Sequence, residues 1–314
     1  MDFNYIENCT NAIVIKDVRN FELAHIFECG QCFRWYREEK GSYIGVAYGK
    51  VIEVEKANND VILHNATEED FKNIWGEYFD LYRDYGEIKH ILSKDDLLAK
   101  SVEFGHGIRL LKQDPFEMIV SFIISANNRI PMIKRAIKNI SEKWGDPIEY
   151  KGCIYYSFPT VEQFKDATEE ELKACGVGFR AKYIKDTVNK IYENSVEQSE
   201  QYKKEYDMLW IKNQQDDICH KMLQNYSGIG AKVADCVMLF SMEKYSAFPV
   251  DVWVKRAMQY FYLAPDVSLK KYEILEGKNL ENYQDLPNNI CFIMQEKTKL
   301  MLMRNNINKM KRRK

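Results

Sequence analysis

The sequence predicts an α+β fold: an N-terminal antiparallel β-sheet domain with helices, followed by an all-α domain. Up to about residue 112, short runs of β-branched and aromatic residues are separated by glycines and an Asn-Asn-Asp turn, which is typical of an antiparallel meander. From Gln113 onward, apolar residues recur with a helical period and helix-capping residues precede them. Strands followed by a run of helices indicate the α+β class.

The N-terminal elements follow from local composition. We expect four strands, at Ala12–Ile15, Tyr43–Tyr48, Val51–Glu55 and Val61–His64. Thr67 and Asp70 resemble a capping box, which predicts a helical stretch from this point through Tyr82.

The later helices are marked by their first residues. Asp114 and Pro115 provide a cap and an N1 proline for a buried helix that ends near Asn127 and Asn128. Two more capping signatures, Thr160 with Gln163 and Thr168 with Glu171, predict two short helices. We divide the chain into an α+β domain at 1–112, a helical domain at 113–271 and a divergent segment at 272–314.

Bulk properties exclude several classes of protein. The chain has 314 residues and no apolar run near the roughly 18 residues that span a bilayer, so we expect a cytoplasmic protein, nucleoid-associated if bacterial. The net charge of −2 gives no general nucleic-acid signal, so any DNA contact must be local. The eight cysteines include one CxxC pair, Cys29 and Cys32, which is insufficient for a zinc or iron–sulfur site; we expect no metal and no cofactor.

One stretch carries chemistry. Gly228-Ile-Gly230 predicts a tight turn between two helices, with backbone N–H groups exposed at the second helix for a DNA phosphate. Lys232 follows at that helix start, where the positive dipole end and partial burial favour the neutral, nucleophilic amine. Asp251 lies far enough downstream for one helix and a turn to return its carboxylate to the amine. A lone Lys and Asp are more commonly a surface charge and a helix cap.

The whole string resembles the helix-hairpin-helix, Gly/Pro-Asp superfamily of DNA glycosylases. Within that superfamily, GIGAKVADCVMLFS with AFPVDV is similar to the 8-oxoguanine DNA glycosylase family. Three further segments match in order as far as about Lys271: GQCFRW, QDPFEMIVSFIISANN and GVGFRAKYI.

The resemblance implies a bifunctional DNA glycosylase and lyase that excises 8-oxoguanine from duplex DNA, with no membrane partner and as a monomer. Lys232 would displace the base at C1′, form a Schiff base and nick the strand by β-elimination, while Asp251 stabilises the cationic sugar. The Gly30 carbonyl would accept the N7 hydrogen of the lesion, and Cys236 and Phe292 would contact the base. The resemblance assigns the DNA contacts to Asn127, Phe179, Arg180, Gly228, Gly230 and Val252.

Several of these residues have a structural alternative. Gly30 can be a turn glycine, Cys236 a core thiol, Asn127 a helix C-cap and Phe179 a core aromatic. Asn127 would fill the gap left by the flipped nucleotide, with Phe179 as a wedge. We expect Arg180 on an exposed loop, where it would read the opposite strand.

The sequence departs from the family at two single positions. Met132 stands where many relatives carry an arginine that contacts the estranged cytosine, which predicts a weaker preference for cytosine opposite the lesion. Trp253 replaces a phosphate-contacting histidine of some relatives.

The larger departure follows Lys271. The family's Gly-aromatic-Ala-Gln-x-x-Leu-Phe helix is missing; Asn288 stands at the Gln codon and Phe292 coincides with the stacking Phe. Back-translation in the shifted frame, with permitted wobble bases, reads IRDFGREKFGKLSGFAQQYLFYYARE, which contains the motif. We therefore hypothesise a one-base deletion in the codons of Lys270 and Lys271, in the allele or in the recorded gene.

Two other functions remain open. The chain can be a related superfamily glycosylase for another damaged base, or an inactive helix-hairpin-helix DNA-binding protein because of its altered C-terminus. An amine nucleophile separates these classes, since it leaves a covalent adduct on borohydride reduction.

Overall fold

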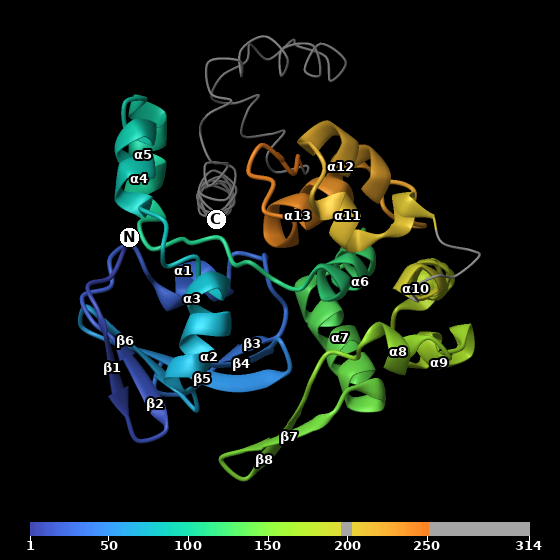
Figure 1. Ribbon diagram of the computed structural model, residues 1–314, viewed down its shortest axis with the longest axis horizontal. Helices are drawn as coiled ribbons and strands as arrows, with labels where there is room; N and C mark the ends of the chain where they lie inside the picture. Colours follow the sequence, from blue (N-terminus) through green and yellow to red (C-terminus); the bar gives the residue numbers. More distant parts are fainter. Residues whose placement is uncertain (196–202, 251–314) are drawn as a thin grey trace, which may run out of the picture.

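The computed structural model describes residues 1–195 and 203–250. Figure 1 shows two parts that lie against each other, a sheet with helices at the N-terminus and a mainly helical part after it. The α+β class predicted from the sequence is confirmed.

The N-terminal sheet has six antiparallel strands in the order β1-β2-β6-β5-β4-β3. They are β1 (Ile6–Cys9), β2 (Ala12–Ile15), β3 (Trp35–Arg37), β4 (Tyr43–Ala47), β5 (Lys50–Ala57) and β6 (Asp60–His64). The four predicted strands are the four inner ones, with small shifts at their ends. The edge strands β1 and β3 were not predicted, because β1 is largely exposed and β3 has three residues, so neither carries a run of buried β-forming residues.

Helices and turns accompany this sheet, and the last two of the helices extend away from it (Figure 1). They are α1 (Leu23–Phe27), α2 (Glu68–Asp70), a π-helical turn (Phe71–Trp75), α3 (Gly76–Tyr78), α4 (Tyr85–Leu92) and α5 (Asp96–Phe104). The predicted capping box is confirmed, since Thr67 and Asp70 each accept the backbone N–H of the other. The helical stretch ends at Tyr78 rather than Tyr82, because Asp80 adopts a left-handed backbone with φ of 50°.

The second part contains eight α-helices within the described residues: α6 (Pro115–Ser125), α7 (Ile130–Trp144), α8 (Val161–Phe164), α9 (Glu169–Ala174), α10 (Ala181–Ser195), α11 (Met208–Lys212), α12 (Asp216–Leu223) and α13 (Ala231–Ser241). Helix α6 lies at the centre, and its residues Phe116 and Met118–Ile124 are buried. Its predicted start is confirmed, because Asp114 accepts the N–H of Glu117 and Pro115 is the first helical residue. The capping boxes at Thr160 and Thr168 are confirmed as well.

This part is not entirely helical, which corrects the predicted all-α domain. The strands β7 (Pro147–Tyr150) and β8 (Cys153–Tyr156) form a two-stranded hairpin. Its two-residue turn is Lys151-Gly152, with both residues at positive φ, and it lacks the Asn-Gly or Asp-Gly signal that marks such turns in a sequence. Tyr150 packs with Ile44 and Val46 of β4, so the hairpin extends over the N-terminal sheet.

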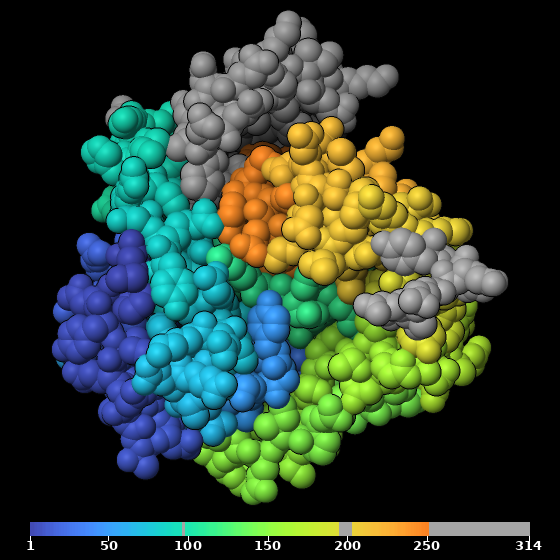
Figure 2. Space-filling model, viewed as in Figure 1, coloured from blue at the N-terminus to red at the C-terminus, as the bar shows by residue number. Residues whose placement is uncertain are grey.

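Buried polar side chains join the two parts. The Gln31 side chain donates to the carbonyls of Ile26 (2.8 Å) and Arg109 (2.9 Å) and accepts from the N–H of Leu111 (3.0 Å). Gln113 then donates to the Gln31 carbonyl (2.8 Å). On the face drawn in Figure 2, the blue and cyan N-terminal residues and the green and yellow helical residues form one continuous surface. The division at 112/113 stays a prediction.

Candidate DNA-lesion site at the helical hairpin

The predicted helix-turn-helix is formed by α12 and α13, with residues 224–230 between them. Gly228 has a φ of +85°, and a Cβ there would lie 3.1 Å from the Tyr183 side chain of α10, so this position requires glycine. Gly230 is the N-cap of α13 with an ordinary extended φ of −95° and open space around it. Its lack of a side chain therefore leaves room for a ligand to approach the backbone.

The start of α13 offers free backbone donors. The Gly230 carbonyl accepts the N–H groups of Val233 (3.0 Å) and Ala234 (2.9 Å). The N–H groups of Ala231 and Lys232 belong to the first turn, and no acceptor within residues 1–195 and 203–250 takes them. This is the anion-binding arrangement that the sequence predicts.

Polar contacts hold the turn against α10. The Ser227 hydroxyl donates to Asp186 (2.5 Å), which also pairs with Lys190 (2.8 Å). These contacts fix the turn to α10. The N–H groups at the start of α13, which follows the turn, therefore keep a defined direction.

Lys232 is the second residue of α13 and its side chain is exposed. The predicted partial burial is wrong for this residue, because its ammonium lies over the Phe122 ring of α6 rather than within the core, with Nζ 5.7 Å from the ring centroid. Phe122 is stacked in turn on Phe240 of α13, at 5.6 Å between ring centroids. The amine is thus accessible to a substrate on a surface that two packed helices support.

Three residues assigned from the resemblance, Asp251, Val252 and Phe292, lie outside the described residues. Trp253 and Asn288 lie there too. Their predicted roles stay predictions.

Gly30 lies in the loop between α1 and β3, where it is half-buried with a φ of +89°. Its conformation fits the turn-glycine alternative. No donor in the described part of the chain bonds its carbonyl, whereas Gln31 beside it is fully buried and fixed by four hydrogen bonds. The loop therefore presents a carbonyl acceptor on a rigid base, as the predicted role requires.

Within the described residues, no two cysteines form a disulfide. Cys236 is 3% exposed and belongs to the core of the helical part, one turn after Lys232. Burial raises the pKa of Cys32 well above its ordinary value and that of Cys219 to about 11. Among residues 1–195 and 203–250 no cluster of potential metal ligands occurs.

The other predicted DNA-contacting residues gather at the C-terminal end of α6. Asn127 follows that helix, is exposed and has a φ of 51°, which also fits the alternative of a helix C-cap. Phe179 is 61% exposed, so it is not a core aromatic. Arg180 is only 7% exposed, which corrects its predicted place on an exposed loop. Its guanidinium is directed inward because it donates to the carbonyls of Ala126, Asn127 and Val177.

Sequence reasoning missed two groups near the hairpin. Tyr183 lies between Phe179, at 6.3 Å between ring centroids, and the Gly228 turn. His220 of α12 has Nε2 at 3.3 Å from both the Ala231 carbonyl and the Asp235 carboxylate of α13. The predicted hairpin could have indicated the His220 contacts, because it places α13 beside α12.

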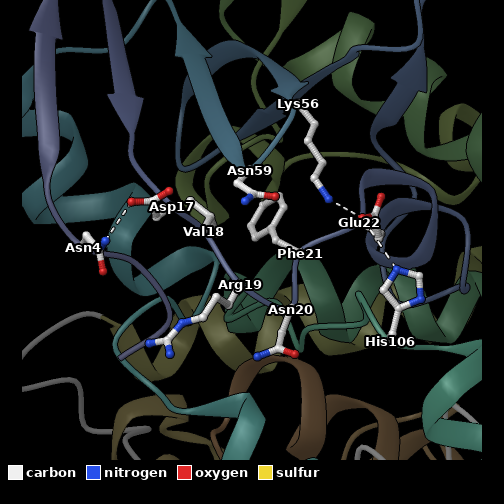
Figure 3. A pocket seen from close by; sticks show the side chains of 10 residues that line it. All are labelled: Asn4, Asp17, Val18, Arg19, Asn20, Phe21, Glu22, Lys56, Asn59 and His106. Carbon is white, nitrogen blue, oxygen red and sulfur yellow. Dashed lines mark hydrogen bonds and ion pairs between the residues drawn. The ribbon is translucent and has the colours of Figure 1, made fainter.

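A cavity of about 470 Å³ lies away from the hairpin, in the N-terminal part (Figure 3). All of its lining residues fall between positions 4 and 106. Several of its charged and polar groups are paired with each other, as Lys56 is with Glu22 and Asn4 with Asp17 (2.8 Å). No predicted site residue lines it.

Two family models divide the chain between them. One, described as 8-oxoguanine DNA glycosylase, N-terminal domain, matches residues 13–119. The other, described as HhH-GPD superfamily base excision DNA repair protein, matches residues 120–283.

Known relatives agree with both models. An N-glycosylase/DNA lyase of Saccharomyces cerevisiae is 31% identical over 277 residues, covering 82% of this chain and 70% of the relative. The crystal structure of a Clostridium acetobutylicum 8-oxoguanine glycosylase/lyase, in complex with duplex DNA containing cytosine opposite 8-oxoguanine, is 54% identical with a TM-score of 0.88. That match covers 95% of this chain and 99% of the other. With sequence models, a curated relative and a solved structure in agreement, the chain belongs to the HhH-GPD superfamily of base excision DNA repair proteins, as a member of its 8-oxoguanine DNA glycosylase family.

Proposed function

We propose that this chain is a bifunctional DNA glycosylase and lyase that removes 8-oxoguanine from duplex DNA, with Lys232 as the nucleophile. The observation that carries the proposal is the position of Lys232. It is an exposed amine in the first turn of α13, where the backbone N–H groups of Ala231 and Lys232, without an acceptor in the described residues, can bind a phosphate of the same DNA strand. Each sugar of a DNA strand is bonded to a phosphate, so binding of the phosphate by these N–H groups brings the sugar close to the amine.

The chemistry follows from an amine at this place. The lone pair of Lys232 Nζ forms a bond to C1′ while the bond from C1′ to the base breaks, and its electron pair leaves with the base. Loss of an amine proton and opening of the sugar ring give a Schiff base. Removal of a C2′ proton then expels the 3′ phosphate and nicks the strand. Asp251 is proposed to stabilise the positive charge that develops on the sugar.

Recognition of the lesion is proposed to use the residues around this amine. The Gly30 carbonyl accepts the N7 hydrogen that oxidation adds to guanine, Cys236 and Phe292 contact the base, and Gly228, Gly230 and Val252 bind the strand. The exposed residues Asn127 and Phe179 enter the duplex where the base has left it. Since the net charge of the chain is −2, these local contacts must supply the affinity.

Sodium borohydride trapping tests the proposal. The purified chain is incubated with duplex DNA containing 8-oxoguanine, and separately with a duplex containing an abasic site. Lys232→Gln is compared with Lys221→Gln, a matched control at an exposed lysine in the last turn of α12. We expect a covalent adduct on both duplexes for the natural chain and the control, and none for Lys232→Gln.

Each other outcome contradicts part of the proposal. An adduct on the abasic duplex alone indicates a glycosylase for another damaged base. Binding of DNA with no adduct on either duplex indicates an inactive DNA-binding protein. An adduct that persists in Lys232→Gln assigns the nucleophile to another residue.

We propose further that the enzyme acts as a monomer in the cytoplasm. Sedimentation tests the oligomeric state, and cell fractionation tests the localisation. Among the helices the structure describes, none has the length and apolar character to cross a bilayer.

A further inference from the structure

The 3-10 helical turn Gly178–Arg180 before α10 exposes one side chain and buries its neighbour, although the two lie in contact, with Arg180 Cζ 4.5 Å from the centroid of the Phe179 ring. Gly176 and Gly178 have φ values of +92° and +62°, which only glycine adopts easily. These two turns leave Phe179 61% exposed and Arg180 7% exposed. Arg180 therefore points back into the protein, toward the end of α6.

Within the described residues, every hydrogen bond of the Arg180 guanidinium goes to a backbone carbonyl, and its one aromatic contact is with the Phe179 ring. Nε and Nη2 donate to the Ala126 carbonyl (3.1 and 2.5 Å), Nη2 also donates to the Asn127 carbonyl (3.1 Å), and Nη1 donates to the Val177 carbonyl (3.2 Å). Four of the five guanidinium N–H groups are thus used. No carboxylate in residues 1–195 or 203–250 pairs with Arg180, and burial lowers the pKa of this guanidinium.

The acceptors have a special place in the fold. Ala126 is the C-cap of α6 and Asn127 follows it, so their carbonyls lie at the negative end of the helix dipole. A buried cation is stabilised there without a carboxylate. In return, the guanidinium fixes the direction of the backbone at the point where the chain leaves the helix.

Asn127 depends on this backbone for its position. Its left-handed conformation, with φ of 51°, is unfavourable for most side chains. Its side chain is exposed and makes no hydrogen bond within the described part of the chain. The direction in which the amide projects is therefore set by the turn that Arg180 holds.

We propose that Arg180 is a positioning residue, which forms the Asn127 turn in advance so that the Asn127 amide can enter the duplex when the damaged base leaves it. This inference rests on the proposed function and differs from the resemblance, in which Arg180 itself reads the opposite strand. Direct reading through more than the one remaining N–H would require Arg180 to give up carbonyl bonds that hold the turn. A residue that acts through Asn127 has no effect of its own on which base stands opposite.

A double-mutant cycle tests the proposal. Arg180→Ala, Asn127→Ala and the double variant are assayed in single turnover for excision of 8-oxoguanine opposite each of the four bases. We expect Arg180→Ala to lower the excision rate by roughly 100-fold, the order of loss that misplacement of a contacting group produces. The loss is expected to be equal opposite all four bases. In the Asn127→Ala background it should fall to about threefold or less, because the effects of substituting two residues that act through one contact do not add.

Controls separate positioning from loss of fold. Melting temperatures identify any unfolded variant, and Arg180→Lys, which keeps the charge but cannot bridge several carbonyls, serves in the cycle if Arg180→Ala does not fold. Lys182→Ala removes an exposed cation two residues away and is expected to show no coupling to Asn127. Trapping on a duplex that already contains an abasic site is expected to change less than excision, since no base has to leave the helix.

Two results would overturn the proposal. A loss confined to cytosine opposite the lesion would make Arg180 a direct reader, and fully additive losses would separate it from Asn127. Failure of the natural chain to excise 8-oxoguanine would instead refute the proposed function, so the two failures are distinguishable.

Discussion

Replacing Arg34 with methionine is expected to cost about 3–5 kcal/mol of the free energy of unfolding, because it leaves a buried carboxylate without its partner. Arg34 and Glu117 of α6 form an ion pair at 3.2 Å, with side chains 9% and 12% exposed. Arg34 also donates to the Tyr156 carbonyl of β8. The pair therefore joins the loop that carries Gly30 to the helical part.

The loss is expected to depend on pH. Burial raises the pKa of Glu117 from 4.5 to about 6 even beside Arg34, a shift equivalent to about 2 kcal/mol. Because the native state then binds more protons than the unfolded state, the contribution of Glu117 to stability is present below pH 4.5 and is lost as pH rises through about 6. Without Arg34 the pKa of Glu117 rises further, and the cost in stability of its buried charge at higher pH grows. The difference between Arg34→Met and the natural chain should therefore be larger at pH 8 than at pH 5.

Urea denaturation followed by tryptophan fluorescence measures this difference at both pH values. Lys138→Met, which removes an exposed partner of Glu142 at 3.6 Å, serves as the control and should cost no more than about 1 kcal/mol at either pH. Adding Glu117→Gln to Arg34→Met should recover part of the loss at pH 8. An equal loss at pH 5 and pH 8, with no recovery from the second substitution, would refute the reasoning.

Three further predictions use other parts of the chain. Burial lowers the pKa of Lys89 from 10.5 to about 8. Between these two pH values the native state binds fewer protons than the unfolded state, so the stability rises with pH. Lys89→Met should therefore flatten the rise in denaturation midpoints between pH 8 and 10. Met132, exposed at the start of α7, should confer preference for cytosine when changed to arginine, seen as a roughly tenfold or greater rise in the excision ratio of cytosine over adenine opposite the lesion; an unchanged ratio would place this residue away from the estranged base. Inserting one base at the codons of Lys270 and Lys271 should increase excision of 8-oxoguanine by the chain, and resequencing that finds the present tail in an active gene would count against the deletion.

The sequence predicted the elements whose signals are local. The inner strands carry runs of buried β-branched residues, and the starts of α6, α8 and α9 are marked by cap residues whose hydrogen bonds span three positions. The β7–β8 hairpin was missed because its turn is Lys151-Gly152 and its stability comes from packing on a sheet about a hundred residues earlier in the chain. That packing cannot be read from a local pattern.

The site divides in the same way. The hairpin, with Gly228 at positive φ and Lys232 in the first turn, follows from adjacent residues. The exposure of Lys232 and the burial of Arg180 depend on α6, which lies far from both in the sequence. A motif gives the type of residue at each position, whereas the direction of a side chain is decided by its neighbours in space.

The buried thiols bear on the conditions in which such an enzyme works. Guanine is oxidised when a cell is under oxidative stress, and the same oxidants attack cysteine as its thiolate. Burial raises the pKa of Cys32, Cys175 and Cys219, so these side chains stay protonated at neutral pH as well as shielded. Among the cysteines in the described ranges, oxidation should therefore be directed to the exposed Cys9 and Cys153, which lie on strands of the two sheets. The core of the protein is in this respect resistant to the agents that create its proposed substrate.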